Sequence, residues 1–361
     1  MVREVSLSAL AVLCLLAGCA AATSVPAPET RAVDALFAGY TGAVPGASLI
    51  VIRDGRVLYR RAYGLARLDP AVPATPETDY RLASLTKQFT ATAIMLLERD
   101  GKLRYDQPVG DFLRELAPAA RKLTIRQLLT HTSGVWDYES LIPDSQTTQV
   151  SDRDILALLG AKDSVQFPAG SQFHYSNSAY VLLGLVVARV SGMSFPQFLA
   201  TRVFTPLGMT HSLAYVPGGT DIPNRALGYT PDSGKFLPTD QSVTSATLGD
   251  GGVYTSVDDL VKWDAALTNA TLLDRAHLTQ AVTSATLADG TPTGYGFGWY
   301  VDRYHGHVRN YHHGETSGFR NYIVRFPDDR LTIVILTNRS TGDLTALSDR
   351  ITDLFLPEAS R

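Results

Sequence analysis

The chain has 361 residues, of which 45% are hydrophobic and 19% charged, and its formal net charge is −3. These values exclude a disordered chain, a collagen-like chain and a coiled coil, and the near-neutral balance argues against a dedicated nucleic-acid binder. Cys14 and Cys19 are the only cysteines, and both lie near the N-terminus. The body of the chain therefore has neither a disulfide framework nor a cysteine-based metal site.

The first element in chain order is a targeting segment. Arg3 is followed by an apolar run over residues 5–17, which is too short to span a bilayer and is typical of a signal peptide. The run ends in Leu-Ala-Gly-Cys at residues 16–19, which resembles the lipobox of bacterial lipoproteins. The resemblance implies cleavage before Cys19 and lipidation of that cysteine. The alternative is ordinary secretion with cleavage near residues 20–22.

We therefore expect residues 1–18 to be a lipoprotein signal peptide and residues 19–31 to be a flexible tether. The mature protein is then exported and anchored to a membrane of the bacterial cell envelope by its lipid, facing the periplasm. Under the alternative cleavage it is soluble in the periplasm or secreted. No later apolar run reaches the length of a membrane span.

Two hairpins are predicted, one near each end of the body. Residues 48–52 and 57–59 flank an Asp-Gly turn at 54–55, and residues 322–326 and 331–336 flank a second turn. We expect both chain ends to build one antiparallel sheet flanked by helices. The fold class is then mixed α/β (α+β), with a mostly helical region inserted between the two hairpins.

The segments between the hairpins have helical signals. Residues 84–100 are rich in helix formers and stop before Gly101, and residues 179–190 are nearly all apolar and stop before Gly192. Ser256 begins a capping box that predicts a helix through residue 267. We expect a single domain over 32–361, with a sheet subdomain at about 32–83 plus 290–361 and a helical subdomain at about 84–289.

Three short motifs point to nucleophilic chemistry. Ser84 and Lys87 stand three residues apart at the start of a helix, so the amine can reach the hydroxyl and take its proton. Tyr175 and Asn177 lie in the loop before the apolar helix, where a phenol can shuttle a proton and an amide can bind a carbonyl group.

The third motif is His312-His313-Gly314, where a strand ends and where a glycine allows close approach of the backbone. Each motif alone is weak evidence for an active site. All three motifs in this order are expected about 0.01 times by chance.

With these motifs the sequence resembles the superfamily of serine β-lactamases and penicillin-binding proteins. The similar branch contains class C β-lactamases, D-alanyl-D-alanine carboxypeptidases and family VIII esterases. Further stretches resemble that branch as well: residues 128–134, 206–209, 251–256 and 314–319. The resemblance covers about residues 32–355 and implies the β-lactamase/transpeptidase-like fold.

The resemblance also implies a mechanism in which Ser84 forms an acyl-enzyme that water releases. Lys87 and Tyr175 then move the proton, and the resemblance leaves open which of them is the general base. Asn177 orients the acyl chain. His312 and Gly314 stand at the third motif, and the backbone N–H groups of Ser84 and Glu315 form the oxyanion hole. No metal or organic cofactor is implied, and the substrate is a small molecule or a peptidoglycan-related ester, peptide or β-lactam.

The third motif departs from the pattern of β-lactamases, which usually have lysine and threonine where this chain has His312 and His313. A histidine of ordinary pKa is mostly neutral at pH 7. We therefore expect an esterase or D,D-peptidase-like enzyme that is weak on substrates bearing a carboxylate. If His312 is protonated near pH 6, it resembles the family's lysine and that weakness is relieved.

Two other classes of protein are weighed against the enzyme. A metal enzyme is suggested by four nearby histidines at 305, 307, 312 and 313, but no acidic ligand motif accompanies them. A non-catalytic periplasmic protein that binds or senses peptidoglycan is the second alternative. The presence of all five motif side chains argues against that alternative.

Overall fold

The computed structural model describes residues 28–219 and 221–356. The expected signal peptide and Cys19 lie outside this part of the chain. Residues 28–31, expected as the end of the tether, instead form the first turn of helix α1 (Pro28–Leu36). Glu29 stands in that first turn, where a negative charge favours the helix N-terminus.

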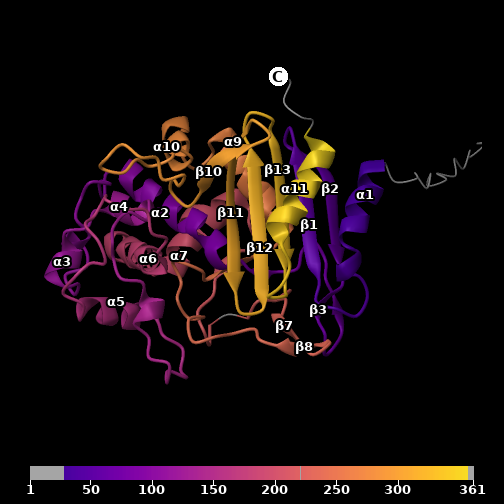
Figure 1. Ribbon diagram of the computed structural model, residues 1–361, viewed down its shortest axis with the longest axis horizontal. Coiled ribbons are helices and arrows are strands. Elements are labelled where there is room, and N and C mark those ends of the chain that lie inside the picture. The colour runs from indigo at the N-terminus through magenta and orange to yellow at the C-terminus, as the bar shows by residue number, and fades with distance from the viewer. Residues whose placement is uncertain (1–27, 220, 357–361) are drawn as a thin grey trace, which may run out of the picture.

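One six-stranded antiparallel sheet joins the two ends of the chain, as the two hairpins predict. Figure 1 shows its first strands, in indigo, beside its last strands, in orange and yellow. The join is made by β1 and β13, which pair with Ile50 opposite Val334. The strand order is β10 (Tyr300–Tyr304), β11 (His307–Thr316), β12 (Phe319–Phe326), β13 (Leu331–Thr337), β1 (Ala47–Arg53) and β2 (Arg56–Tyr63).

The Asp-Gly turn of the first hairpin has the expected geometry. Asp54 has φ +53° and Gly55 has φ +72°, and two positive φ angles are what a tight two-residue hairpin turn requires. Strand β10 was not expected, and of β11 only a strand end near residues 312–314 was expected. Their residues are mostly polar and aromatic, so the apolar alternation that marks a half-buried strand is weak there.

Helices cover both faces of the central strands, which explains why β13 is buried over its whole length. Helices α1 and α11 (Leu344–Phe355) pack together over one face, and α9 (Val257–Asn269) packs against β1 and β13. The predicted N-cap is present, because the Ser256 side chain accepts a hydrogen bond from the backbone N–H of Asp259. The reciprocal bond of a capping box does not form, because the Asp259 carboxylate accepts from His211 N and Ser212 Oγ instead.

The helical region lies beside the sheet, around α2 (Lys87–Arg99) and α6 (Asn177–Ser191), which pack against each other. Both helices were expected, with small differences at their starts. Residues 83–86 form a 3₁₀ turn before α2, and α6 begins at Asn177 because Ser176 caps it.

The remaining elements are short. The helices are α3 (Pro118–Arg121), α4 (Ile125–Leu129), α5 (Asp152–Gly160), α7 (Phe195–Leu199), α8 (Thr205–Leu207) and α10 (Arg275–Ala281). Single 3₁₀ turns are η1 (Ala38–Tyr40), η2 (Ala83–Thr86), η3 (Val109–Asp111) and η4 (Tyr138–Ser140), and η5 (Ala200–Phe204) is a π-helical turn. Three small sheets pair β3 (Leu65–Arg67) with β4 (Val72–Pro73), β5 (Tyr80–Arg81) and β6 (Leu213–Ala214) with β9 (Val253–Thr255), and β7 (Tyr229–Asp232) with β8 (Lys235–Pro238).

Within residues 28–219 and 221–356, no single helix is long and apolar enough to cross a membrane. Two successive segments, Asn177–Ser191 and Phe195–Leu207, reach the required length only together, across a bend of 74°. Most residues of the first segment are buried in the core of this domain.

Helix α9 is fastened to the sheet by a buried charge, which gives a test of the fold. Asp264 accepts hydrogen bonds from Arg325 Nε at 2.8 Å and Thr332 Oγ1 at 2.7 Å. Asp264→Ala should lower the free energy of unfolding by about 3 kcal/mol, because it leaves a largely buried guanidinium without its carboxylate and Thr332 without its acceptor. Urea unfolding followed by circular dichroism measures this.

The matched control lies on the same helix. Asp258 pairs with Arg60 where both side chains are partly exposed, so Asp258→Ala should cost at most about 1 kcal/mol. Equal losses for the two variants would contradict the assignment of Asp264 as the buried link between α9 and the sheet.

Candidate active site

Ser84 lies in a strained turn between the small sheet and α2. Ala83, just before it, has φ +52°, a left-handed conformation that costs a residue other than glycine about 1–3 kcal/mol. The turn is held in place by Leu82, whose N–H donates to the carbonyl of Val253 at 2.8 Å. Ser84 itself is half-buried, so its hydroxyl is positioned by the turn and is still within reach of a substrate.

Lys87 is fully buried and donates three hydrogen bonds. Its Nζ lies 3.0 Å from Ser84 Oγ, 2.8 Å from Asn177 Oδ1 and 3.0 Å from the carbonyl oxygen of Asp250. An ammonium has three N–H donors, so all of them are satisfied. The structure therefore brings together the predicted Ser84, Lys87 and Asn177, and adds Asp250, which was not expected.

Burial lowers the pKa of Lys87 to about 8, although carboxylates nearby act in the opposite direction. These carboxylates belong to Asp250, Asp137 and Glu139. A lysine with this pKa is available as a neutral amine near pH 8. When the amine is neutral, the hydrogen bond to Ser84 can reverse, with the hydroxyl donating to Nζ.

Tyr175 lies against the lysine, with its ring centroid 4.8 Å from Lys87 Nζ. Its phenolic oxygen is buried and forms no hydrogen bond within the described part of the chain. Burial raises the pKa of Tyr175 well above 10, and the neighbouring Ser84 hydroxyl opposes this shift without cancelling it. Tyr175 is therefore a protonated phenol at neutral pH and has a proton to donate.

Both the backbone and the side chain of Asn177 form hydrogen bonds within the protein. Its backbone N–H donates to Asp137 Oδ2 at 2.7 Å, and its side-chain Nδ2 donates to Glu139 Oε1 at 3.1 Å. Its Oδ1 accepts from Lys87. In this geometry Asn177 positions the lysine, and the second N–H of Nδ2 could donate to the carbonyl oxygen of a substrate acyl group.

His312 and Gly314 lie inside strand β11, whereas the sequence suggested the end of a strand. His312 is fully buried, and its Nδ1 lies 2.6 Å from the carbonyl oxygen of His313. A carbonyl accepts only, so Nδ1 carries the proton and Nε2 accepts a hydrogen bond from the Tyr295 hydroxyl at 3.0 Å.

This environment keeps His312 neutral. Burial, together with the charge of Lys87, lowers the pKa of His312 well below 6.5. The condition under which His312 would resemble the family's lysine, protonation near pH 6, is therefore disfavoured in this structure, because His312 is fully buried and both ring nitrogens already have partners.

Gly314 lets β11 lie directly against the turn that carries Ser84. A Cβ at this position would be 2.1 Å from the carbonyl oxygen of Leu82 and 3.1 Å from Leu85 Cδ1. The glycine was expected to permit close approach to a ligand, and here it permits close approach of two backbone segments. Glu315, next along the strand, pairs with Arg320 at 3.3 Å.

Other groups around the site were not singled out from the sequence. His131 accepts a hydrogen bond from the Ser176 N–H at 3.1 Å and packs on Tyr175, with ring centroids 4.3 Å apart. Tyr295 and Tyr300 complete an aromatic wall beside His312. His131 lies in the family-like stretch 128–134, which could have drawn attention to it, whereas nothing local distinguishes Tyr295.

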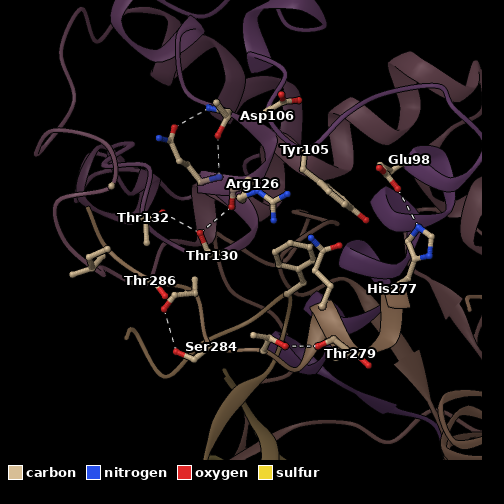
Figure 2. Close-up of a pocket in the computed structure, with 18 of the residues that line it drawn as sticks. Glu98, Tyr105, Asp106, Arg126, Thr130, Thr132, His277, Thr279, Ser284 and Thr286 are labelled. Carbon is tan, nitrogen blue, oxygen red and sulfur yellow. Dashed lines mark hydrogen bonds and ion pairs between the residues drawn. The ribbon is translucent and has the colours of Figure 1, made fainter. Parts of the chain in front are cut away.

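A cavity of about 1360 Å³ lies away from these residues. Its walls come from α4, α10 and the segment 283–288, and Figure 2 shows Arg126 and Tyr105 pointing into it. Ser84, Lys87, Tyr175 and His312 do not line it. The candidate active site is therefore identified by its chemistry and not by the size of a cavity.

The histidines at 305 and 307 lie apart from His312, each beside its own carboxylate. His305 is 3.7 Å from Asp353, and His307 is 2.8 Å from Asp329. Within the described ranges, no group of three or more histidine, cysteine or acidic side chains is placed to hold a metal ion.

Comparison with known proteins gives consistent results. The family model described as Beta-lactamase matches residues 33–355. The chain is 31% identical over 308 residues to penicillin-binding protein 4* of Bacillus subtilis (strain 168), which covers 81% of this chain and 68% of that protein. It is 27% identical over 314 residues to a D-aminopeptidase of Gluconobacter oxydans (strain 621H), covering 86% of this chain and 58% of that protein.

A solved structure extends the likeness to the fold. The D-amino acid amidase of Ochrobactrum anthropi SV3, in complex with L-phenylalanine amide, superposes with a TM-score of 0.76 at 25% identity. The match covers 91% of this chain and 97% of that one.

Proposed function

The chain belongs to the beta-lactamase family of serine hydrolases, and we propose that it forms an acyl-enzyme on Ser84 and hydrolyses an amide or ester bond. The observation that carries this proposal is the contact of 3.0 Å between Ser84 Oγ and the buried amine of Lys87. A serine becomes a nucleophile when a neighbouring base takes its proton. The Lys87 amine is close enough to Ser84, and its pKa is low enough, for it to take that proton.

The two candidate proton carriers have different roles in this proposal. Neutral Lys87 takes the proton of Ser84 as Oγ forms a bond to the substrate carbonyl carbon. Tyr175 gives its proton to the leaving group as the scissile bond breaks, and the Lys87 ammonium then restores the phenol. The opposite pKa shifts of Lys87 and Tyr175 support this division.

The second half-reaction uses the same groups. A water molecule loses a proton to Lys87 and attacks the acyl carbon, and Ser84 regains a proton as its ester bond breaks. We propose the backbone N–H groups of Ser84 and Glu315 as the oxyanion hole. One such donor is worth about 3–4 kcal/mol in the transition state, and the close packing at Gly314 supports the placement of this strand beside Ser84.

The strand side of the site favours substrates without a carboxylate. His312 is neutral, and the charge of Arg320 is balanced by Glu315. Arg309 is engaged by Asp302 and Asp349. When a substrate carboxylate binds on this side, it loses its hydration and none of these groups offers an unpaired positive charge. Its desolvation is therefore costly.

The opposite side of the site is acidic. Asp137 and Glu139 lie around Asn177, and both carboxylates act on the charge of Lys87. We propose that acyl groups with a free amino group are accepted there, as in a D-amino acid amide or a peptide with a free N-terminus. The names of two relatives, a D-aminopeptidase and a D-amino acid amidase, support this substrate class.

We also propose that the protein is a lipoprotein of the bacterial cell envelope, anchored through Cys19. The sequence Leu-Ala-Gly-Cys at residues 16–19 and the apolar run before it support this. In that location peptidoglycan-related amides are within reach of the site.

The nucleophile is tested by covalent labelling. Ser84→Ala should abolish adduct formation with a fluorophosphonate or fluorescent penicillin, seen by intact-mass spectrometry. The variant should still fold, with a lowered melting temperature because the buried Lys87 ammonium loses one of its three acceptors. Tyr175→Phe should still label but turn over about 10²–10⁴-fold more slowly. Wild-type protein that neither labels nor turns over any ester or amide would favour the non-catalytic peptidoglycan-binding alternative.

Substrate charge is tested with N-acetyl-D-alanyl-D-alanine and its C-terminal amide, which differ only in the carboxylate. The amide should have the higher kcat/KM at pH 7.5, and the ratio should stay constant down to pH 6 because His312 stays neutral. His312→Lys should raise the relative rate of the carboxylate about tenfold, equivalent to ~1.4 kcal/mol. His312→Gln is the neutral control, and a ratio that changes towards pH 6 would contradict the proposal.

The anchor is tested by metabolic labelling with a clickable fatty acid. Wild-type protein should be labelled and should fractionate with membranes, whereas Cys19→Ser should be unlabelled and soluble, since stable anchoring needs several acyl chains. An unlabelled wild-type protein would reject the lipoprotein proposal.

A further inference from the structure

Asp250 lies directly behind Lys87, in a tight loop between residues 249 and 252. Its carbonyl oxygen accepts a hydrogen bond from Lys87 Nζ at 3.0 Å. Its carboxylate is buried, with Oδ2 accepting from the Tyr138 hydroxyl at 2.8 Å. The other oxygen, Oδ1, is buried with no hydrogen-bond partner in the described part of the chain.

The loop is fixed against the elements that carry the catalytic groups. The carbonyl of Gly249 accepts from Thr90 Oγ1 of α2 at 2.6 Å, and a Cβ on Gly249 would be 2.3 Å from the carbonyl oxygen of Tyr180 in α6. Tyr138 is itself tied to α6, because its N–H donates to Ser178 Oγ at 2.8 Å. Asp250 therefore has little freedom to move relative to Lys87.

A buried carboxylate with one unpartnered oxygen is costly unless a positive charge lies nearby. Lys87 supplies that charge. From this geometry we propose that Asp250 is a positioning residue for proton transfer: its carbonyl aims the Lys87 amine at Ser84, and its carboxylate is the built-in counter-charge of the ammonium.

This inference rests on the proposed role of Lys87 as the general base. The charge of Asp250 helps to set the pH above which Lys87 is a neutral amine. Among the carboxylates that raise the pKa of Lys87 against the effect of burial, Asp250 has the largest effect. Other groups also face the lysine. They are the carboxylates Asp137 and Glu139, the phenols Tyr175 and Tyr180, and the imidazoles His131 and His312.

The imidazoles contribute no charge that could replace that of Asp250. Burial lowers the pKa of His131 and of His312 well below 6.5, so both are neutral over the range in which Lys87 titrates. Asp137 and Glu139 lie at the mouth of the site around Asn177, and Glu139 is exposed, so solvent screens its charge more than that of Asp250.

The experiment is a pH profile of kcat/KM for a neutral p-nitrophenyl ester, with Ser84→Ala as the blank for spontaneous hydrolysis. In the wild type, activity should rise with pH through the pKa of Lys87, near 8. Asp250→Asn keeps the carbonyl and an acceptor for Tyr138 but removes the charge. Its rising limb should move to lower pH by about one unit, so that the variant is relatively more active at pH 6.5.

Asp152→Asn is the matched control. Asp152 is also a buried acid close to this loop, and its Oδ1 accepts from the Leu248 N–H at 2.9 Å. Burial raises the pKa of Asp152 to about 8, so below that pH the substitution alters a buried acid without removing a full charge. Asp152 is also not among the carboxylates that act on Lys87, so the rising limb of Asp152→Asn should stay at the wild-type pH. Asp250→Glu, which restores the charge, should return the limb towards the wild-type position.

The outcomes distinguish the role of Asp250 from the role of Lys87 as the general base. A wild-type limb near pH 8 that stays in place in Asp250→Asn, or that moves equally in Asp152→Asn, overturns the role of Asp250 alone. A wild-type profile without this limb overturns Lys87 as the base. If Asp250→Asn does not fold, Asp250→Ser provides the same neutral comparison, and an unmoved limb in that variant overturns the proposal equally.

Discussion

The site depends on the burial of one ammonium group. Lys87 is out of contact with water, and a buried charge is tolerated only when its donors are bonded and an opposite charge is near. Its three acceptors come from the Ser84 turn, the first residue of α6 and the loop at Asp250. Three segments far apart in the sequence must therefore meet at one atom, and this requirement fixes the relative positions of Ser84, Lys87 and Asn177.

The second constraint is steric and acts through the backbone. Strand β11 can lie beside the Ser84 turn only because Gly314 has no side chain. The turn keeps its shape although the left-handed φ of Ala83 is energetically unfavourable. The sheet that supplies β11 is closed by the pairing of β1 with β13, so both ends of the chain contribute to the position of one catalytic turn. Stability of the sheet and geometry of the site are in this way coupled.

Much of this arrangement could be predicted from local sequence. The two hairpins, the apolar helix and the three motifs all have short-range signals, such as Asp-Gly at 54–55 and Ser-x-x-Lys at 84–87. Strand β11 could be predicted only as a strand that ends near His312, because its full length depends on pairing with its neighbours and not on its own polar residues. Asp250 lies 163 residues from Lys87, and no spacing rule links them. The proton on His312 depends on a carbonyl and a tyrosine that only the fold brings to it.

The histidine at the third motif also changes what that position does. A lysine there would present a charge to the substrate, whereas His312 uses both ring nitrogens inside the protein and holds the hydroxyl of Tyr295. Protonation of Nε2 would require the Tyr295 hydroxyl to turn its proton away, and in this fully buried position the lost hydrogen bond costs more than it would in water. The positive charge of the site is thus confined to Lys87 and is matched by carboxylates on the side of Asn177 and Asp250. The proposed preference for substrates without a carboxylate rests on this distribution of charge, because on the strand side a negative group would lose its water without gaining a positive partner.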